Sequence, residues 1–252
     1  MAILSPENEL STDLLLKLSS FMFWCSVYLY CSSRAPAQSA EYCSRVVTLL
    51  HGSVATVVGL QQCGVSSLSL NRFVGKTLSR HYALMLWSWG YFAFDLMWCV
   101  VSWTESALML CHHCCALAAI TMYMNKPYSG CTFGCSIAML ECTNPLLQTR
   151  WLLRNEGQDT TKLYYTIEIL YLVAFIMIRG VIGSYAVYKI LKSDMFATDE
   201  KAMAVIFYVV SILFIHEILG YISYKYKQKV QEYRENTINY ISTKINYLFG
   251  RN

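Results

Sequence analysis

Seven runs of mostly apolar residues, separated by short charged stretches, dominate this sequence of 252 residues. A helix that crosses the hydrocarbon core of a bilayer needs about 17–25 such residues, and each run is long enough. The composition agrees, because 56% of the residues are hydrophobic and 14% are charged, against about 45–50% and about 25% in soluble proteins. The sequence therefore predicts an all-α fold, a polytopic membrane helical bundle with about seven transmembrane helices. The expected helices span residues 13–31, 46–65, 82–102, 106–124, 128–148, 163–190 and 202–224.

The chain divides into three parts. Residues 1–41 form an N-terminal region with the first transmembrane helix, residues 42–224 form a core of six further helices, and residues 225–252 form a basic tail. The N-terminus is acidic at Glu7, Glu9 and Asp13, and it lacks the basic start of a cleaved signal peptide. We therefore expect the first helix to be retained.

The positions of the charges predict an orientation in the membrane. The side of the C-terminal tail holds 11 Lys and Arg residues, six of them in the tail itself, against 7 on the other side. Cytosolic loops carry an excess of Lys and Arg, so we expect a cytosolic C-terminus, in the endoplasmic reticulum or the plasma membrane. Because the charges sit in short loops, no nucleic-acid partner is expected.

The tail carries an apolar stripe at helical spacing, formed by Ile238, Ile241, Ile245 and Leu248. Such a stripe among polar residues is typical of a helix that lies on a membrane surface. A solvated tail without a membrane contact is the alternative interpretation.

Ionisable side chains inside the apolar runs are the candidate functional residues, because charge in a bilayer is costly and marks function. Counted from the side of the C-terminal tail at about 1.5 Å per residue, six of them on six spans lie roughly 8–12 Å deep. We expect most of them to share one polar cavity, although His51 or His216 alone fits a helix–helix contact and Glu168 fits interfacial solvation. Arg179 falls towards the opposite membrane face, where it would snorkel or bind a lipid head group. The six residues are His51, Asp95, His112, Glu141, Glu168 and His216.

Two adjacent histidines, His112 and His113, stand in the middle of this layer. Neighbours on a helix are rotated by about 100°, so we expect one to do the chemistry while the other orients or packs. Glu141, Asn144 and Gln148 add a polar face at helical spacing. The ring of Pro145 cannot donate to the carbonyl of Glu141, which predicts a kink at that point.

Eleven cysteines raise the question of disulfides and metals. Several, including Cys63, lie inside apolar runs, where cysteine behaves as a small hydrophobic residue. Cys111 and Cys114 flank the histidines with metal-ligand spacing, but one continuous helix cannot wrap an ion. A haem between His112 and either His51 or His216 is a further alternative that no spacing selects. We therefore expect no metal and no other cofactor.

Four motifs in order resemble the TLC-domain family of ceramide synthases and translocating-chain-associated membrane proteins, most closely its small stand-alone members. They are Arg45 to His51 (RVVTLLH), Gly90 to Asp95 (GYFAFD), Leu110 to His113 (LCHH) and Leu140 to Trp151 (LECTNPLLQTRW). The likeness covers about residues 42–224 and implies a six-helix TLC core preceded by one extra helix. In ceramide synthases the first histidine of the pair, here His112, is expected to carry the acyl group from acyl-coenzyme A. Those enzymes have two aspartates where this chain has Glu141 and Asn144, which weakens the case for the same reaction.

Three functions follow as hypotheses. The first is a protein that binds membrane lipids in a polar cavity and influences lipid composition, with His51, Asn144, Gln148 and His216 lining the cavity. The second is an acyltransferase-like enzyme that uses acyl-coenzyme A, in which the catalytic set is His112, His113, Asp95 and Glu141. The third is a non-catalytic transport or trafficking factor, in which buried polar residues hold helices together.

Overall fold

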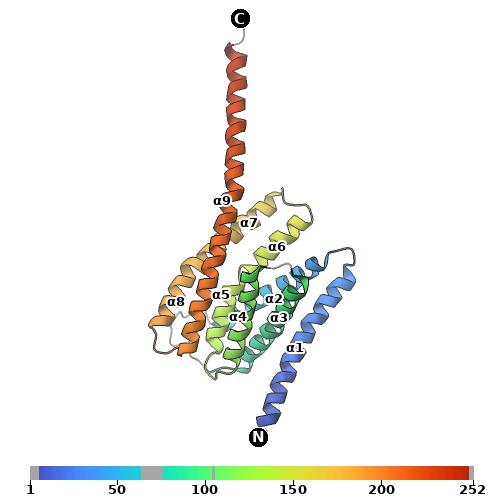
Figure 1. Ribbon diagram of the computed structural model, residues 1–252, viewed down its shortest axis with the longest axis vertical. Coiled ribbons are helices and arrows are strands. Elements are labelled where there is room, and N and C mark those ends of the chain that lie inside the picture. Colours follow the sequence, from blue (N-terminus) through green and yellow to red (C-terminus); the bar gives the residue numbers. More distant parts are fainter. Residues whose placement is uncertain (1–5, 64–75, 104–105, 250–252) are drawn as a thin grey trace.

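The computed structural model describes residues 6–63, 76–103 and 106–249, and all regular secondary structure in these ranges is helical. The chain runs up and down through a bundle, with α1 and α8 on opposite sides (Figure 1). The elements are α1 (Pro6–Arg34), α2 (Ala40–Cys63), α3 (Ser79–Ser102), α4 (Ala107–Met124), α5 (Gly130–Glu141), α6 (Asn144–Asn155), α7 (Lys162–Phe175), the π-helix η2 (Ile176–Ile182), α8 (Gly183–Lys192) and α9 (Thr198–Phe249).

Six helical stretches are long and apolar enough to cross a membrane. They confirm the predicted all-α membrane bundle and match six of the seven expected crossings. These stretches are Ser11–Arg34, Ala40–Cys63, Ser79–Ser102, Ala107–Met124, Lys162–Lys192 and Thr198–Ile241.

The expected crossing at residues 128–148 is built from two helices, α5 and α6. α5 ends at Glu141, and α6 begins at Asn144 with Pro145 in its first turn. Proline is tolerated in a first turn because its missing N–H needs no helical partner there. It cannot donate to the carbonyl of Glu141, so one continuous helix cannot form. The kink predicted at Pro145 is therefore a complete break in the helix.

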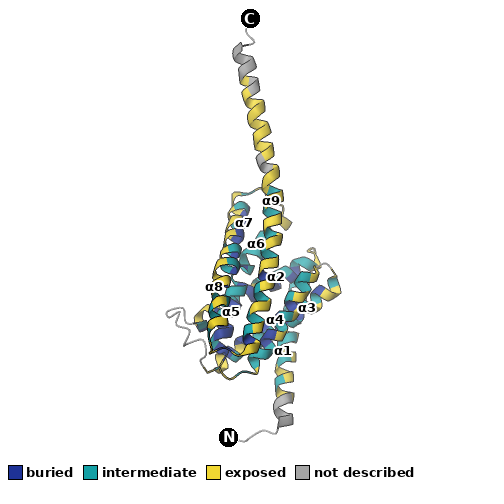
Figure 2. Cartoon of the chain, turned by 60° about the vertical axis from the view of Figure 1, so that its left-hand side comes forward, coloured by how far each residue is buried: buried dark blue, intermediate teal, exposed yellow. Residues whose placement is uncertain are grey.

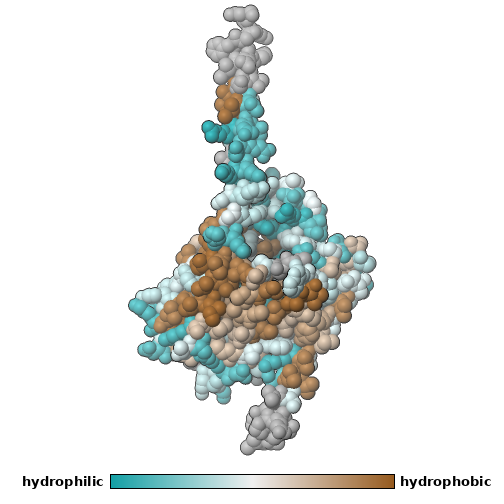
Figure 3. Space-filling model, viewed as in Figure 1, coloured by the Kyte–Doolittle hydropathy of each residue, from teal (hydrophilic) through white to brown (hydrophobic). Residues whose placement is uncertain are grey.

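The outer surface of the bundle is apolar. Large hydrophobic side chains such as Leu15, Val101 and Val173 are more than half exposed, and buried residues concentrate between the helices (Figure 2). Figure 3 shows hydrophobic surface across the middle of one face, with hydrophilic surface above and below it. This distribution fits a bundle that is surrounded by lipid.

The first helix packs closely against α3. The side chain of Trp24 is fully buried and donates to the carbonyl of Trp87 over 3.0 Å, while Ser20 donates to the carbonyl of Leu86 over 2.8 Å. Gly90 makes this approach possible, because a Cβ atom there would lie 2.5 Å from the carbonyl carbon of Ser20. α1 is therefore an integral part of the bundle.

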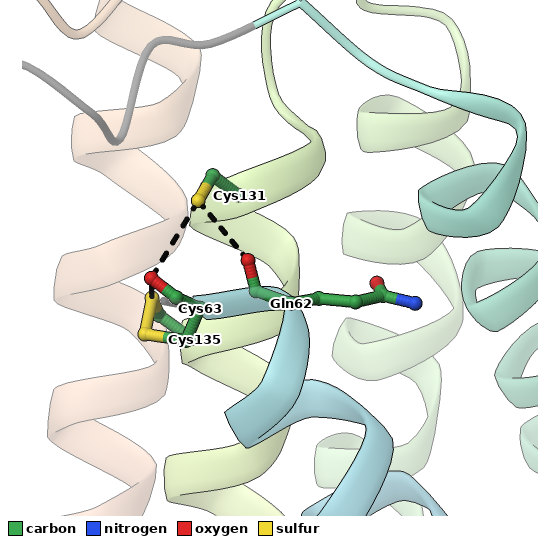
Figure 4. The surroundings of a disulfide bond; sticks show 4 residues. All are labelled: Gln62, Cys63, Cys131 and Cys135. Carbon is green, nitrogen blue, oxygen red and sulfur yellow. Dashed lines mark hydrogen bonds between the residues drawn. A yellow bond between two sulfur atoms is a disulfide. The ribbon is translucent and has the colours of Figure 1, made fainter. Parts of the chain in front are cut away.

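A disulfide joins the end of α2 to α5, which corrects the expectation that Cys63 is only a small hydrophobic residue. Cys63 and Cys135 are 72 residues apart in sequence, and their Cα atoms are 4.7 Å apart. Figure 4 shows the pair beside Cys131, whose thiol donates to the carbonyl of Gln62. α1 leads away from the N-terminus and α2 returns, so the end of α2 lies at the end of the bundle that holds the N-terminus (Figure 1). The bond at Cys63 fixes α5 there.

The last helix passes from the seventh crossing into the tail without a break. α9 covers 52 residues, from Thr198 to Phe249, and its distal part projects beyond the bundle along the same axis (Figure 1). Ile238 and Ile241 are about half exposed on this projection. The tail is thus helical as the apolar stripe indicates, but it continues the line of the span instead of turning flat.

Candidate functional site

Polar side chains from several helices meet in the middle of the bundle, and the first group joins α3 to α4. His113 Nε2 lies 3.3 Å from Asp95 Oδ2, and both side chains are almost fully buried. The hydroxyl of Tyr91 lies 3.1 Å from the same carboxylate oxygen and 3.1 Å from Thr48 Oγ1. A buried carboxyl group is costly without hydrogen-bonding partners. Asp95 therefore pairs with His113 Nε2 and is supported by Tyr91, while His113 Nδ1 is buried without a partner among the described residues.

A second group joins α2 to the break between α5 and α6. His51 Nδ1 lies 3.6 Å from Glu141 Oε2, and the amide of Asn144 donates to that oxygen over 2.7 Å. The ring of Tyr91 stacks on His51 with centroids 3.8 Å apart. Gly52 lets the helices approach, since a Cβ atom there would lie 3.0 Å from Asn144 Cβ. The break between α5 and α6 thus places the amide of Asn144 beside the carboxylate of Glu141.

His112 takes a different direction from His113 and lines a cavity between α4, α5, η2, α8 and α9. The cavity has a volume of about 100 Å³ and is partly open to the surroundings. Glu141, Arg179 and Ser211 also line it, and most of its other walls are apolar. The Nδ1 atom of His112 is buried and has no hydrogen-bond partner among the described residues. This atom is available to a bound molecule.

Arg179 belongs to this cavity, which corrects its expected position towards the opposite membrane face. Its side chain is buried within η2. It donates to the carbonyl of Leu140 in the last turn of α5, and its Nη1 lies 3.4 Å from Ser211 Oγ. A cation at the C-terminal end of a helix is stabilised by the helix dipole. The remaining donor, Nε, is buried and has no partner among the described residues.

The sequence held a signal for this residue. Arg179 lies near the middle of the Lys162–Lys192 span of 31 residues, which is longer than a bilayer requires. A depth counted from one end of so long a segment is unreliable. A position near the middle of the segment is the better guide to depth in the membrane. Ser211 and Tyr91 had no comparable signal, because a single hydroxyl in an apolar run is common.

Glu168 lies apart from the central groups, which corrects its expected place in the shared layer. It is fully buried and accepts hydrogen bonds from Tyr221 over 2.6 Å and from Lys225, with Arg150 Nη1 at 3.3 Å. Along the helix it is about 16 Å from Arg179. Glu168 and its partners therefore form a separate ionic cluster near the membrane side of the C-terminal tail.

None of the four residues expected to line the cavity does so: His51 and Asn144 contact Glu141 beside it, and His216 and Gln148 lie elsewhere. His216 is exposed on α9 and faces away from the bundle, so the layer does not include it. Gln148 is buried on α6, with Oε1 unpartnered among the described residues, but it does not line the cavity. A depth count gives the height of a residue and not its direction around the helix, which explains the error at His216.

The metal and haem alternatives have no assembled site of the kind considered. Cys111 and Cys114 are exposed on α4, and His51 contacts Glu141 and Ser88 instead of facing His112. A different trio, Asp95, Cys99 and His113, has donor atoms within 4.8 Å of one another. The direct contact between His113 and Asp95 needs no ion, and a metal-free site stays our prediction.

The chain matches the family model of the TLC domain of the TRAM, LAG1 and CLN8 group. The matched region covers residues 41–225. It includes both polar groups, the cavity and the cluster around Glu168, and it begins after α1.

Proposed function

This chain belongs to the TLC-domain family, and we propose from this premise that it is a multi-pass membrane protein that binds a lipid in its central cavity. The lipid places its polar end at His112 and Arg179 and its chain along the apolar walls. By holding or passing on such lipids, the protein influences the lipid composition of its membrane.

The observation that carries this proposal is the pair of unsatisfied atoms at the cavity. His112 Nδ1 and Arg179 Nε are both buried and unpartnered, and both residues line the same cavity. A buried polar atom without a partner costs about 1–3 kcal/mol. A ligand with a carbonyl or carboxyl group can accept from the arginine and meet the histidine, so the site favours the polar end of an acyl chain.

The walls of the cavity suit one chain. Ala116, Ala119, Gly183 and Ala186 line it, and small side chains leave room between α4 and α8. His112 and Tyr123, both lining residues on α4, are separated by about 16 Å along the helix axis. An extended hydrocarbon chain in this space would bury apolar surface along its length.

Lipid analysis of the purified protein tests the proposal. Wild type, His112→Ala and Arg179→Met are purified in detergent, and the co-purified lipids are measured by mass spectrometry. We expect a defined acyl lipid in the wild type and about tenfold less in both variants, which corresponds to the loss of one good polar contact. Cys114→Ala, an exposed change on the same helix, is the matched control. Equal lipid in all four proteins would contradict the proposal, and no defined lipid in any of them would favour a trafficking role.

Acyl transfer is the second candidate, supported by the free Nδ1 of His112. In this reaction the imidazole nitrogen attacks the thioester carbonyl of acyl-coenzyme A, an acyl–nitrogen bond forms, and coenzyme A leaves as the thiol. An amine acceptor then takes the acyl group and the imidazole is regenerated. Asp95 contacts His113 and not His112. The residues that orient the His112 ring are therefore those of the cavity wall. The intact mass of the protein after incubation with acyl-coenzyme A distinguishes this function, because only a nucleophilic His112 gains the acyl mass.

The orientation is part of the proposal. Disulfides persist in oxidising compartments and are rare in the cytosol. The Cys63–Cys135 bond therefore supports a lumenal or extracellular position for the N-terminal side, and a cytosolic position for the tail. This agrees with the excess of basic residues on the side of the tail, in the endoplasmic reticulum or the plasma membrane.

A further inference from the structure

Two ionisable residues on α9 face outward at a depth where lipid is expected. His216 and Glu217 are both exposed, and His216 precedes Lys225 by about 13 Å along the helix. Lys225 marks the membrane surface through its ion pair with Glu168. Neither His216 nor Glu217 has a polar partner among the residues that the structure describes. Ionisable groups in hydrocarbon require a partner, so this face of α9 needs a covering molecule.

The same face offers close approach to another helix. Leu213, Glu217, Gly220 and Tyr224 follow one another at steps of four, three and four, so they lie on one side of α9. Leu213 and Tyr224 are 47% and 69% exposed. A Cβ atom added at Gly220 would meet nothing within 4 Å. Gly220 is therefore not needed for packing inside the bundle. Small residues beside polar ones are typical of helix–helix contacts in membranes.

The cytosolic part of α9 continues this face. Ile238 and Ile241 are 54% and 50% exposed, and the sequence extends their stripe to Ile245 and Leu248. Counted at seven-residue repeats, these positions share the register of Leu213, Glu217, Gly220 and Tyr224. An isolated helix with an exposed apolar stripe is marginally stable in water. Between Tyr224 and Ile238 the same register holds Lys227, Gln231 and Arg234. The 52-residue helix thus has two separate segments on one side, one in the membrane and one in the distal tail, that lack a partner among the described residues.

We propose that this side of α9 is the contact surface of a parallel homodimer, in which α9 pairs with α9 of a second copy of the chain. In a two-fold symmetric pair each contact occurs twice, so His216 of each copy meets Glu217 of the other. A basic and an acidic residue at the same depth in one copy can therefore pair with the acidic and the basic residue of the other copy. The shared seven-residue register also places Ile238 and Ile241 of the two copies on the same side, so the helices can meet again in the distal tail, beyond Lys227 and Arg234.

Variants in the membrane part test the dimer with the full chain in lipid vesicles. The fraction of dimer is measured by single-molecule photobleaching at several protein-to-lipid ratios. We expect Gly220→Leu and Glu217→Leu each to weaken dimerisation about tenfold, in line with typical contacts between membrane helices. Val173→Leu is the matched control, because Val173 is 56% exposed on α7 and faces lipid elsewhere. A monomeric wild type at every ratio, or equal dimerisation of all variants, would overturn the proposal.

Cysteine cross-linking tests the tail independently. The chain has no cysteine after Cys142, so Ile238→Cys introduces a unique thiol into the tail. We expect rapid cross-linking of Ile238→Cys between copies, and at least tenfold slower cross-linking of Asn236→Cys, which lies on the other side of the helix. Equal rates at the two positions would contradict a parallel pair in this register. Co-purification of a different membrane protein that protects Ile238→Cys would also overturn the proposal, since a second copy would then not be the partner.

Discussion

His112 and His113 are adjacent in the chain, with ring centroids 5.5 Å apart, yet they contact different parts of the bundle. His113 forms a pair with Asp95 on α3, whereas His112 lines the cavity and approaches Phe207 and Phe214 on α9. One residue therefore joins two helices, and the other lines the cavity. Substitutions at the two positions should separate these effects.

We expect His113→Ala to destabilise the protein much more than His112→Ala. The change leaves the carboxyl group of Asp95 buried without its partner on α4, and a buried polar group without a partner costs about 1–3 kcal/mol. Thermal unfolding in detergent measures the difference. Adding Asp95→Asn to His113→Ala should restore part of the melting temperature, because a neutral amide costs less to bury than an unpaired carboxylate. Equal melting temperatures for the two single variants would show that the pair contributes no stability.

Asn144→Asp should destabilise the junction of α5 and α6. Asn144 now donates to Glu141 over 2.7 Å, and an aspartate at this position would bring two carboxylates together without a donor. We expect a loss of about 2 kcal/mol or more in unfolding free energy. Asn144→Ala is the control, since it removes the donor without adding a charge and should cost less. If Asn144→Asp proves the more stable of the two, the side chains do not meet as described.

The Cys63–Cys135 bond should be detectable in protein from membranes. Alkylation without a reductant, followed by mass spectrometry, should leave these two cysteines blocked and the exposed Cys111 and Cys114 modified. Cys63→Ser should lower the unfolding free energy by about 2–4 kcal/mol. The double variant with Cys135→Ser should lose no more than the single one. Alkylation of both cysteines in the unreduced wild type would disprove the bond and remove its support for the orientation.

Gly90→Ala should loosen the attachment of α1. The added Cβ atom would overlap the backbone of Ser20 at 2.5 Å, and a backbone atom cannot move aside as a side chain does. Overpacking of this kind costs about 1–3 kcal/mol. Protease sensitivity of the N-terminal region and the melting temperature report the change. Gly180→Ala, where the nearest atom is a side-chain carbon at 3.4 Å, should be close to neutral, and similar losses in both variants would speak against a specific contact of α1.

The apolar runs predicted the bundle because a bilayer demands a minimum helix length, and the break at Pro145 followed from its missing N–H. Depth counting correctly placed His51 at the height of Glu141 and brought His112 and Glu141 to one cavity, but His51 and Asp95 do not line that cavity. It failed for Arg179 and Glu168, which belong to a span of 31 residues whose position across the membrane is not fixed by length. It also failed for His216, because height does not determine the direction of a side chain.

The pairing of Cys63 with Cys135 could not be read from the sequence. Eleven cysteines allow many pairings, and only the packing of α2 against α5 brings these two within bonding distance. The roles of His112 and His113 were likewise open, because a helical turn of about 100° separates two neighbours but does not say which one faces the cavity.

The continuity of α9 gives the protein a mechanical property. Phe207 and Ser211 of this helix form part of the cavity wall, and no turn or proline separates them from the distal end at Phe249. A displacement of the projecting end is therefore expected to reach the cavity wall through one uninterrupted helix. α9 links the part of the chain outside the bundle to the cavity inside it.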